Sequence, residues 1–256
     1  MAQREYTRSP VVTRREAAVI DRGLQGYMSK VYALMTGAMI LTGIVAYVVG
    51  MDFRAVVNQE PTTVFPPEVI VAMFSSPIRW VIMFAPLIFV FAFSAMINRM
   101  SASTAQMVFW VFGAVMGLSV AWIFAVFTGM SIAQTFFATA AGFGALSIWG
   151  YTTGKDLSGW GSFLLMGLIG LIVAMVLNIF LASEALQWAI SIIGVLLFAG
   201  LTAYDTQSIK NEYLAMRGTH GGEEYLGRSA VMGALRLYLD FLNMFMFLLQ
   251  FMGNRE

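Results

Sequence analysis

Long apolar stretches dominate this sequence and limit what the chain can fold into. A helix that crosses a bilayer needs about 20 mainly apolar residues, because the hydrocarbon core is ~30 Å thick and each residue adds about 1.5 Å. Seven stretches reach this length, so we expect an all-α integral membrane protein with seven transmembrane helices. The predicted spans are Val31–Gly50, Arg79–Asn98, Ser103–Phe127, Ser131–Thr153, Trp160–Ala182, Leu186–Ser208 and Ala230–Met252.

The composition agrees with a membrane protein and excludes several classes of function. Of the 256 residues, 59% are hydrophobic and 11% are charged, whereas a soluble globular chain carries about 25% charged residues. A net charge of +1 excludes a nucleic-acid-binding protein. The chain has no cysteine and one histidine, His220, which rules out thiolate chemistry and leaves little for a zinc site or a Ser-His-Asp triad. We therefore expect neither an enzyme nor a resident cofactor.

The N-terminal residues are polar and do not resemble a signal peptide. Arginines are scattered among acidic residues before the first apolar run, whereas a secretory signal has a short basic start followed by an apolar stretch of about 7–15 residues. We expect residues 1–26 to form a polar, flexible cytoplasmic tail. Residues 27–256 should form a single seven-helix transmembrane domain.

The connections between the spans differ in length. Met51–Ile78 contains four prolines and predicts an extended or capped loop rather than a continued helix. Ile209–Ser229 is rich in glycine and charged residues and predicts a polar surface loop. Two of the predicted breaks between neighbouring spans consist of only a few residues, Thr128–Met130 and Ala182–Ala185. Within the third span, Gly113 and Gly117 form a small-xxx-small pair, which favours close helix packing over a ligand role.

The distribution of basic residues predicts the orientation. With the N-terminus inside, eleven Lys and Arg residues lie on the inner side and three on the outer side, as the positive-inside rule requires. We therefore expect a cytoplasmic N-terminus and a C-terminus outside. The inner residues are Arg4, Arg8, Arg14, Arg15, Arg22, Lys30, Arg99, Lys155, Lys210, Arg217 and Arg228, and the outer ones are Arg54, Arg79 and Arg255.

Two acidic residues fall within predicted spans, Asp205 in the sixth and Asp240 in the seventh. A carboxylate at membrane depth costs a few kcal/mol, so such residues usually face a bundle interior or a wet cavity and are candidates for function. Arg236 lies four residues before Asp240, on the same helical face, and could simply neutralise it. Asp205 could likewise reach the inner surface. Against this structural role for Asp240, Asn243 continues the same polar face.

The sequences around these acids resemble the Bax inhibitor-1 family, also called the transmembrane BAX inhibitor motif family, and most closely its bacterial members. The matching motifs are Ala203–Ile209 and Leu237–Phe245, with a weaker match at Met28–Tyr32, and the likeness extends from Tyr27 to Met252. It implies a bundle of six helices around a central one, in a bacterial inner membrane. It implies a pH-sensitive calcium leak in which Asp205 and Asp240 pair as the gate and Arg99 is the latch. The motif neighbours Tyr204, Thr206, Gln207 and Asn243 would support the pair.

Two features depart from the family pattern. The motif aspartates are 35 positions apart, which indicates a longer connecting loop than in the compact calcium-leak members, and Arg236 lies one turn from Asp240. A cation at this position would lower the attraction of the pore for calcium or compete with Arg99 for the carboxylates. Arg236 is therefore the rival latch.

The chemistry of these residue types fits a pH-controlled contact. Two carboxylates in a low-dielectric site resist double ionisation and share a proton, whereas an arginine stays charged and can bind a carboxylate through two hydrogen bonds. Calcium prefers about six to eight oxygen ligands, and two aspartates supply at most four, so we expect Asp205 and Asp240 to bind calcium weakly or transiently.

Three functional classes remain open from the sequence. The first is a cation leak channel, whose partners would be calcium, protons and the lipid bilayer. The second is a proton-coupled transporter, although the sequence has no visible inverted repeat or broken helix. The third is a non-conducting regulator of other membrane proteins, for example a membrane-bound protease.

Overall fold

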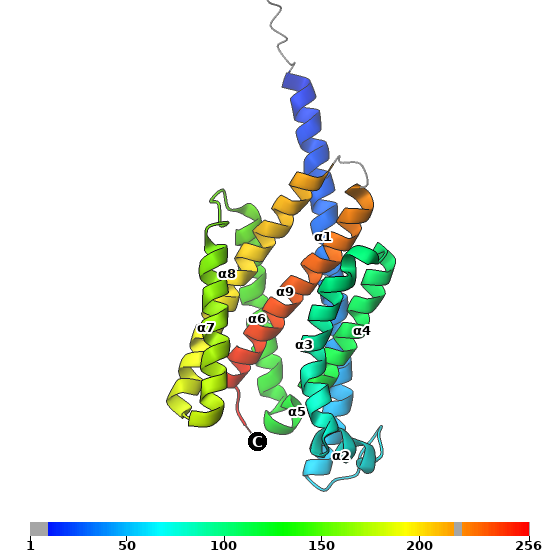
Figure 1. The fold of residues 1–256 in the computed structure, drawn as a ribbon, viewed down its shortest axis with the longest axis vertical. Helices are drawn as coiled ribbons and strands as arrows, with labels where there is room; N and C mark the ends of the chain where they lie inside the picture. Colours follow the sequence, from blue (N-terminus) through cyan, green and yellow to red (C-terminus); the bar gives the residue numbers. More distant parts are fainter. Residues whose placement is uncertain (1–9, 218–221, 256) are drawn as a thin grey trace, which may run out of the picture.

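The computed structural model describes residues 10–217 and 222–255, with the backbone alone for residues 10–21; His220 lies outside these ranges. In this part of the chain there is no β-strand, and seven helical segments are long and apolar enough to cross a bilayer (Figure 1). The protein is therefore an all-α integral membrane protein, as predicted. The elements are α1 (Pro10–Val57), α2 (Pro67–Ser75), α3 (Ile78–Met96), η1 (Ile97–Arg99), α4 (Ala102–Val120), α5 (Ile123–Val126), α6 (Gly129–Thr152), α7 (Trp160–Leu181), α8 (Glu184–Met216) and α9 (Gly222–Met252).

Both of the short predicted breaks are present. The Thr128 hydroxyl accepts a hydrogen bond from the Ser131 amide at 3.2 Å and caps α6. Helix α7 ends at Ala182 in a left-handed conformation, with φ of 45°, and the Ser183 hydroxyl accepts from the Leu186 amide to begin α8. In each case a hydroxyl binds one of the backbone amides that the first turn of a helix leaves without a partner.

Several helices are longer than the sequence predicted. Residues 10–26, predicted to be a tail, are helical and continuous with the first span in α1. The predicted loop Met51–Ile78 includes the last turns of α1 and the short helix α2, which starts with Pro67 at its first position, where proline is tolerated. The predicted surface loop Ile209–Ser229 is mostly helical, because α8 continues to Met216 and α9 starts at Gly222.

Helix α9 is the central element of the bundle. In its most apolar stretch 67% of the residues are buried, against 11% in α7. Helix α9 crosses the bundle diagonally and packs against α8, α1, α6 and α4 (Figure 1). The arrangement agrees with the expected bundle of helices around a central one.

Helices α1, α4 and α9 meet at Thr42. The Thr42 hydroxyl is within 2.7 Å of the hydroxyl of the fully buried Tyr238 and donates to the Gly113 carbonyl at 2.8 Å. A Cβ atom at Gly117 would lie 2.6 Å from the Thr42 carbonyl oxygen, so the two backbones are in direct contact. The predicted packing role of the glycine pair is confirmed.

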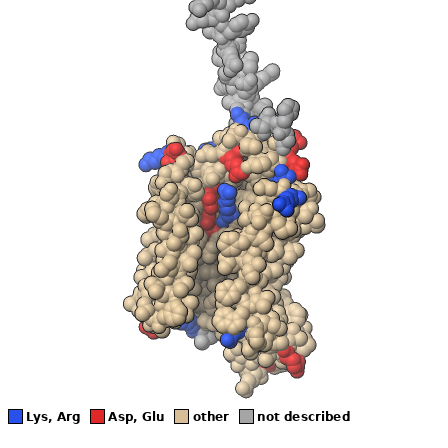
Figure 2. Space-filling model, in the orientation of Figure 1, with Lys and Arg blue, Asp and Glu red and all other residues tan. Residues whose placement is uncertain are grey.

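Charged side chains gather at the two ends of the molecule and leave an uncharged belt between them (Figure 2). Acidic and basic atoms also lie side by side in the hollow below the upper rim, between the two columns of helices. The upper end carries the start of α1, the end of α8 and the start of α9, and the lower end carries α2, α5 and the C-terminus (Figure 1). The two termini of the bundle are therefore at opposite ends.

Candidate functional site

The packing of α8 against α9 brings Asp205 and Asp240 together. The Asp240 side chain is 4% exposed and that of Asp205 is half-buried, and their carboxyl groups are within hydrogen-bonding reach of each other. Oδ2 of Asp240 is buried and receives no hydrogen bond from a donor group in the described residues. Because an ionised carboxylate only accepts hydrogen bonds, a bond between two carboxyl groups requires a proton on one of them.

The nearby positive charge belongs to Arg236. It lies one turn before Asp240 on α9, is half-buried, and its charge acts on both carboxyl groups without a direct ion pair. Arg99, expected to be the latch, ends η1 with an exposed side chain, and in the described residues it makes no ion pair with either aspartate. The expected contact between Arg99 and the aspartates is therefore not seen among the described residues, although Ile97 and Asn98 of η1 line a cavity together with Arg236.

A small cavity of about 80 Å³ lies beside Arg236 at the upper end, and a hydrogen-bonded cluster forms its wall. Glu212 on α8 accepts hydrogen bonds from Tyr225 at 3.0 Å and from Ser229 at 2.6 Å, both on α9. Tyr27 on α1 donates to Ser229 at 3.2 Å, and its ring stacks on Tyr213. The cluster ties α1, α8 and α9 together above the aspartates.

A second cavity of about 400 Å³ lies below the pair, with walls from α3, α4, α7, α8 and α9. Its lining is largely apolar, and Asn243 contributes a polar side chain whose amide also donates to the Leu239 carbonyl at 2.8 Å. Residues 236, 240 and 243 follow helical spacing on one face of α9. Asp240 therefore lies between a residue of the upper cavity and a residue of the lower one.

The other motif residues have separate partners. Gln207 binds the connection between α6 and α7: its carbonyl accepts from the Leu157 amide at 2.7 Å and its amide donates to the Lys155 carbonyl at 2.8 Å. Tyr204 packs against Gly161 at the start of α7. The Thr206 hydroxyl is buried without a partner among the described residues. The printed bonds of Gln207 thus go to the backbone of the loop, and its supporting role toward the carboxyl pair stays a prediction.

The Glu212 cluster is the part of the site that sequence reasoning missed. Its residues on α8 and α9 fall in Ile209–Ser229, which we predicted to be a loop, although Tyr225 and Ser229 have the i, i+4 spacing of one helical face.

As for metal ligands, the described residues contain no group of three or more His, Asp or Glu side chains that could hold an ion. Two carboxyl groups alone form at most a weak cation site.

Comparison with known proteins identifies the family. Residues 24–256 match the family model described as "Inhibitor of apoptosis-promoting Bax1". An uncharacterized protein of Rickettsia prowazekii is 40% identical over 252 residues, covering 98% of this chain and 99% of the relative. The inner membrane protein YbhL of Escherichia coli is 42% identical over 236 residues, covering 91% and 94%. With a family match over nearly its whole length, the chain belongs to the Bax inhibitor-1 family of membrane proteins.

Proposed function

We propose that this protein is a pH-sensitive cation leak channel of the bacterial inner membrane, and that Asp205 and Asp240 form its gate. The observation that carries the proposal is the contact between two carboxyl groups at membrane depth, between the upper and the lower cavity. Burying one carboxyl group in a membrane is costly, and burying two in contact also requires that they share a proton. A purely structural role gives no reason for such an arrangement. Calcium is the proposed cation.

Arg236 gives the gate a second, opposite charge. When the pair holds one proton, a single negative charge remains and attracts Arg236, so α8 and α9 are held together across their interface. A second proton removes that negative charge and leaves Arg236 without a partner in a poorly hydrated site, which destabilises the closed arrangement. Acidification is therefore expected to raise the flux, and in this proposal the charge of Arg236 takes the part that we expected of Arg99.

The test is calcium flux into liposomes that contain the purified protein, at two pH values on either side of neutrality. Asparagine keeps the shape of the aspartate side chain but cannot ionise, so the double variant with Asp205→Asn and Asp240→Asn should conduct equally at both pH values. Each single variant keeps one carboxyl group and should still respond to pH, with the response shifted to lower pH because the like charge next to that group is gone. Asp156→Asn is the matched control, because Asp156 is exposed in the loop after α6 and hydrogen bonds from the Ser158 side chain and amide hold its pKa below the ordinary value. Asp156 thus stays ionised across the tested range and should not affect the profile.

The same measurement separates this proposal from the two other classes. Flux that follows an imposed proton gradient would assign the protein to proton-coupled transporters. Absence of flux from the parent protein in folded, reconstituted form would contradict a channel and favour a non-conducting regulator of other membrane proteins. A parent-like pH profile in the double asparagine variant would show that the pair is not the gate.

A further inference from the structure

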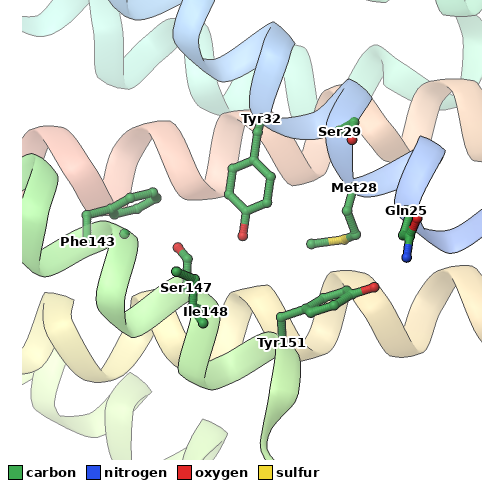
Figure 3. A pocket seen from close by; sticks show the side chains of 9 residues that line it. Gln25, Met28, Ser29, Tyr32, Phe143, Ser147, Ile148 and Tyr151 are labelled. Atoms are coloured by element: carbon green, nitrogen blue, oxygen red, sulfur yellow. The ribbon is translucent and has the colours of Figure 1, made fainter. Parts of the chain in front are cut away.

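A cavity of about 540 Å³ opens between α1 and α6, away from the aspartate pair (Figure 3). These helices both pack on α8 and α9, and those two helices pass behind the cavity in the view of Figure 3. Its walls are mostly apolar, with Met28 and Tyr32 from α1 and Phe143 and Ile148 from α6. All of these residues lie within membrane-spanning segments, and Ile148 is 67% exposed, so the cavity opens toward the lipid.

Two hydroxyl groups point into this cavity, and neither has a hydrogen-bond partner in the part of the chain that the structure describes. The Ser147 side chain is only 4% exposed, and its Oγ makes no hydrogen bond within the described residues. In Figure 3 this hydroxyl and that of Tyr32 point toward the space between the helices. A buried hydroxyl without a partner is costly, so Ser147 favours a ligand that carries acceptor oxygens, and the half-buried Tyr32 hydroxyl can donate to the same ligand.

Two basic residues that do not line the cavity lie next to wall residues at its upper end. Lys210 on α8 donates to the Tyr151 carbonyl at 2.7 Å, and its ammonium lies 5.4 Å from the centroid of the Tyr151 ring, which is part of the cavity wall. Two of the three ammonium donors remain for a ligand. Arg22 is exposed on α1 and lies three residues before the wall residue Gln25, on the same helical face.

We propose that this cavity binds an anionic phospholipid from the leaflet near the start of α1. Its phosphate would bind Lys210 and Arg22, its ester carbonyl oxygens would accept hydrogen bonds from Tyr32 and Ser147, and an acyl chain would contact Phe143. The order of groups along the cavity, from cations through hydroxyls to apolar side chains, matches the order of groups in a phospholipid. Basic pockets between membrane helices are known to recognise anionic headgroups.

Glycines of α6 provide a test by filling the cavity. Gly144 lines it, and a Cβ atom built there meets nothing within 4 Å, so Gly144→Phe should occupy the space without disturbing the helix. Gly142→Phe is the matched control, because that position is equally open but outside the cavity. The readout is native mass spectrometry of protein released from nanodiscs that contain equal amounts of phosphatidylglycerol and phosphatidylcholine. The parent and Gly142→Phe should retain phosphatidylglycerol, and Gly144→Phe should lose it.

Charge variants test the headgroup separately. Lys210→Met and Arg22→Gln should each weaken phosphatidylglycerol retention by about fivefold, since one basic residue near an anionic membrane surface contributes about 1 kcal/mol. Arg79→Gln removes a charge at the opposite end of the bundle and should have no effect. Equal retention of the two lipids by the parent, unchanged retention in Gly144→Phe, or displacement of the lipid by inorganic phosphate alone would overturn the proposal. The melting temperatures of Gly144→Phe and Gly142→Phe should be equal, which shows that a loss of lipid binding does not come from a loss of folding.

Discussion

Arg236 and Arg99 allow the electrostatic part of the gate to be tested with single residues. Both are on the upper half of the bundle, but Arg236 is half-buried beside the carboxyl pair and Arg99 is exposed. An exposed ion pair contributes about 0–1 kcal/mol, and a contact removed from water more. We predict that Arg236→Gln raises flux at neutral pH by roughly 5- to 30-fold, as a loss of about 1–2 kcal/mol implies, and flattens the pH profile.

Arg99→Gln is the control for that prediction, because it removes the same charge from a residue that contacts neither aspartate. Its flux should follow the parent at every pH value in the liposome assay. If Arg99→Gln flattens the pH dependence of flux and Arg236→Gln does not, Arg99 is the latch. In that case η1 moves toward α8 in the functional cycle.

The sequence indicated the two acids and offered Arg99 and Arg236 as their counter-charge, with Arg99 preferred and Arg236 as the rival. A carboxylate inside an apolar span is conspicuous in any reading, because its burial is costly wherever the helix lies. Which arginine lies close to the carboxyl pair depends on where the second span ends and on the side of η1 from which the Arg99 side chain extends. Those are properties of packing, and the sequence pattern is equally compatible with Arg99 and Arg236. The partners of Gln207 were equally invisible in the sequence, since they are backbone atoms of a loop about 50 residues earlier.

At the scale of helices, the contact between α1 and α4 depends on glycine. A Cβ atom at Gly117 would lie 2.6 Å from the Thr42 carbonyl oxygen and 2.8 Å from Cβ of Val45, so the helices must separate to admit a methyl group. Overpacking of this kind costs about 1–3 kcal/mol. We predict that Gly117→Ala lowers the melting temperature of the purified protein in detergent by several degrees.

Gly142→Ala is the matched control, since it makes the same chemical change in a helix where the new methyl group meets nothing within 4 Å. Alanine favours a helix over glycine by about 1 kcal/mol, so this variant should melt at the same temperature as the parent or higher. A Gly117→Ala protein as stable as Gly142→Ala would show that α1 and α4 have room to adjust.

The number of helices followed from the sequence more reliably than their lengths. Apolar length defines the part of a helix inside the bilayer, but α8 and α9 continue beyond that part and are held together by Glu212, Tyr225 and Ser229. Side-chain contacts of this kind between polar residues leave no hydrophobic periodicity. The glycines and charges of Ile209–Ser229 therefore suggested a loop where the structure has helix.

At the scale of the whole molecule, the most buried and the least buried spans differ in the polar residues that they carry. Helix α7 is the most apolar span and the least buried, whereas α9 contains Arg236, Asp240 and Asn243 and is the most buried. Lipid surrounds α7 and tolerates few polar groups, while the neighbours of α9 can supply partners for polar side chains. The position of a helix in a membrane bundle can thus be inferred from the polar residues it retains.

The orientation of the whole bundle is the last prediction. The first helix begins at the upper end and the C-terminus is at the lower end, so the termini must be on opposite sides of the membrane (Figure 1). Lys155, Lys210, Arg217 and Arg228 border the connections at the upper end, and the positive-inside rule assigns that end to the cytoplasm. A reporter active only in the cytoplasm should give a signal when fused to the N-terminus or inserted after Asp156. It should be silent when fused to the C-terminus or when the chain is truncated and fused after Glu60, in the connection between α1 and α2. A signal from the C-terminal fusion would show that the orientation is the reverse of the predicted one. The carboxyl pair, which lies in the upper half of the bundle, would then respond to the pH of the outer compartment instead of the cytoplasm.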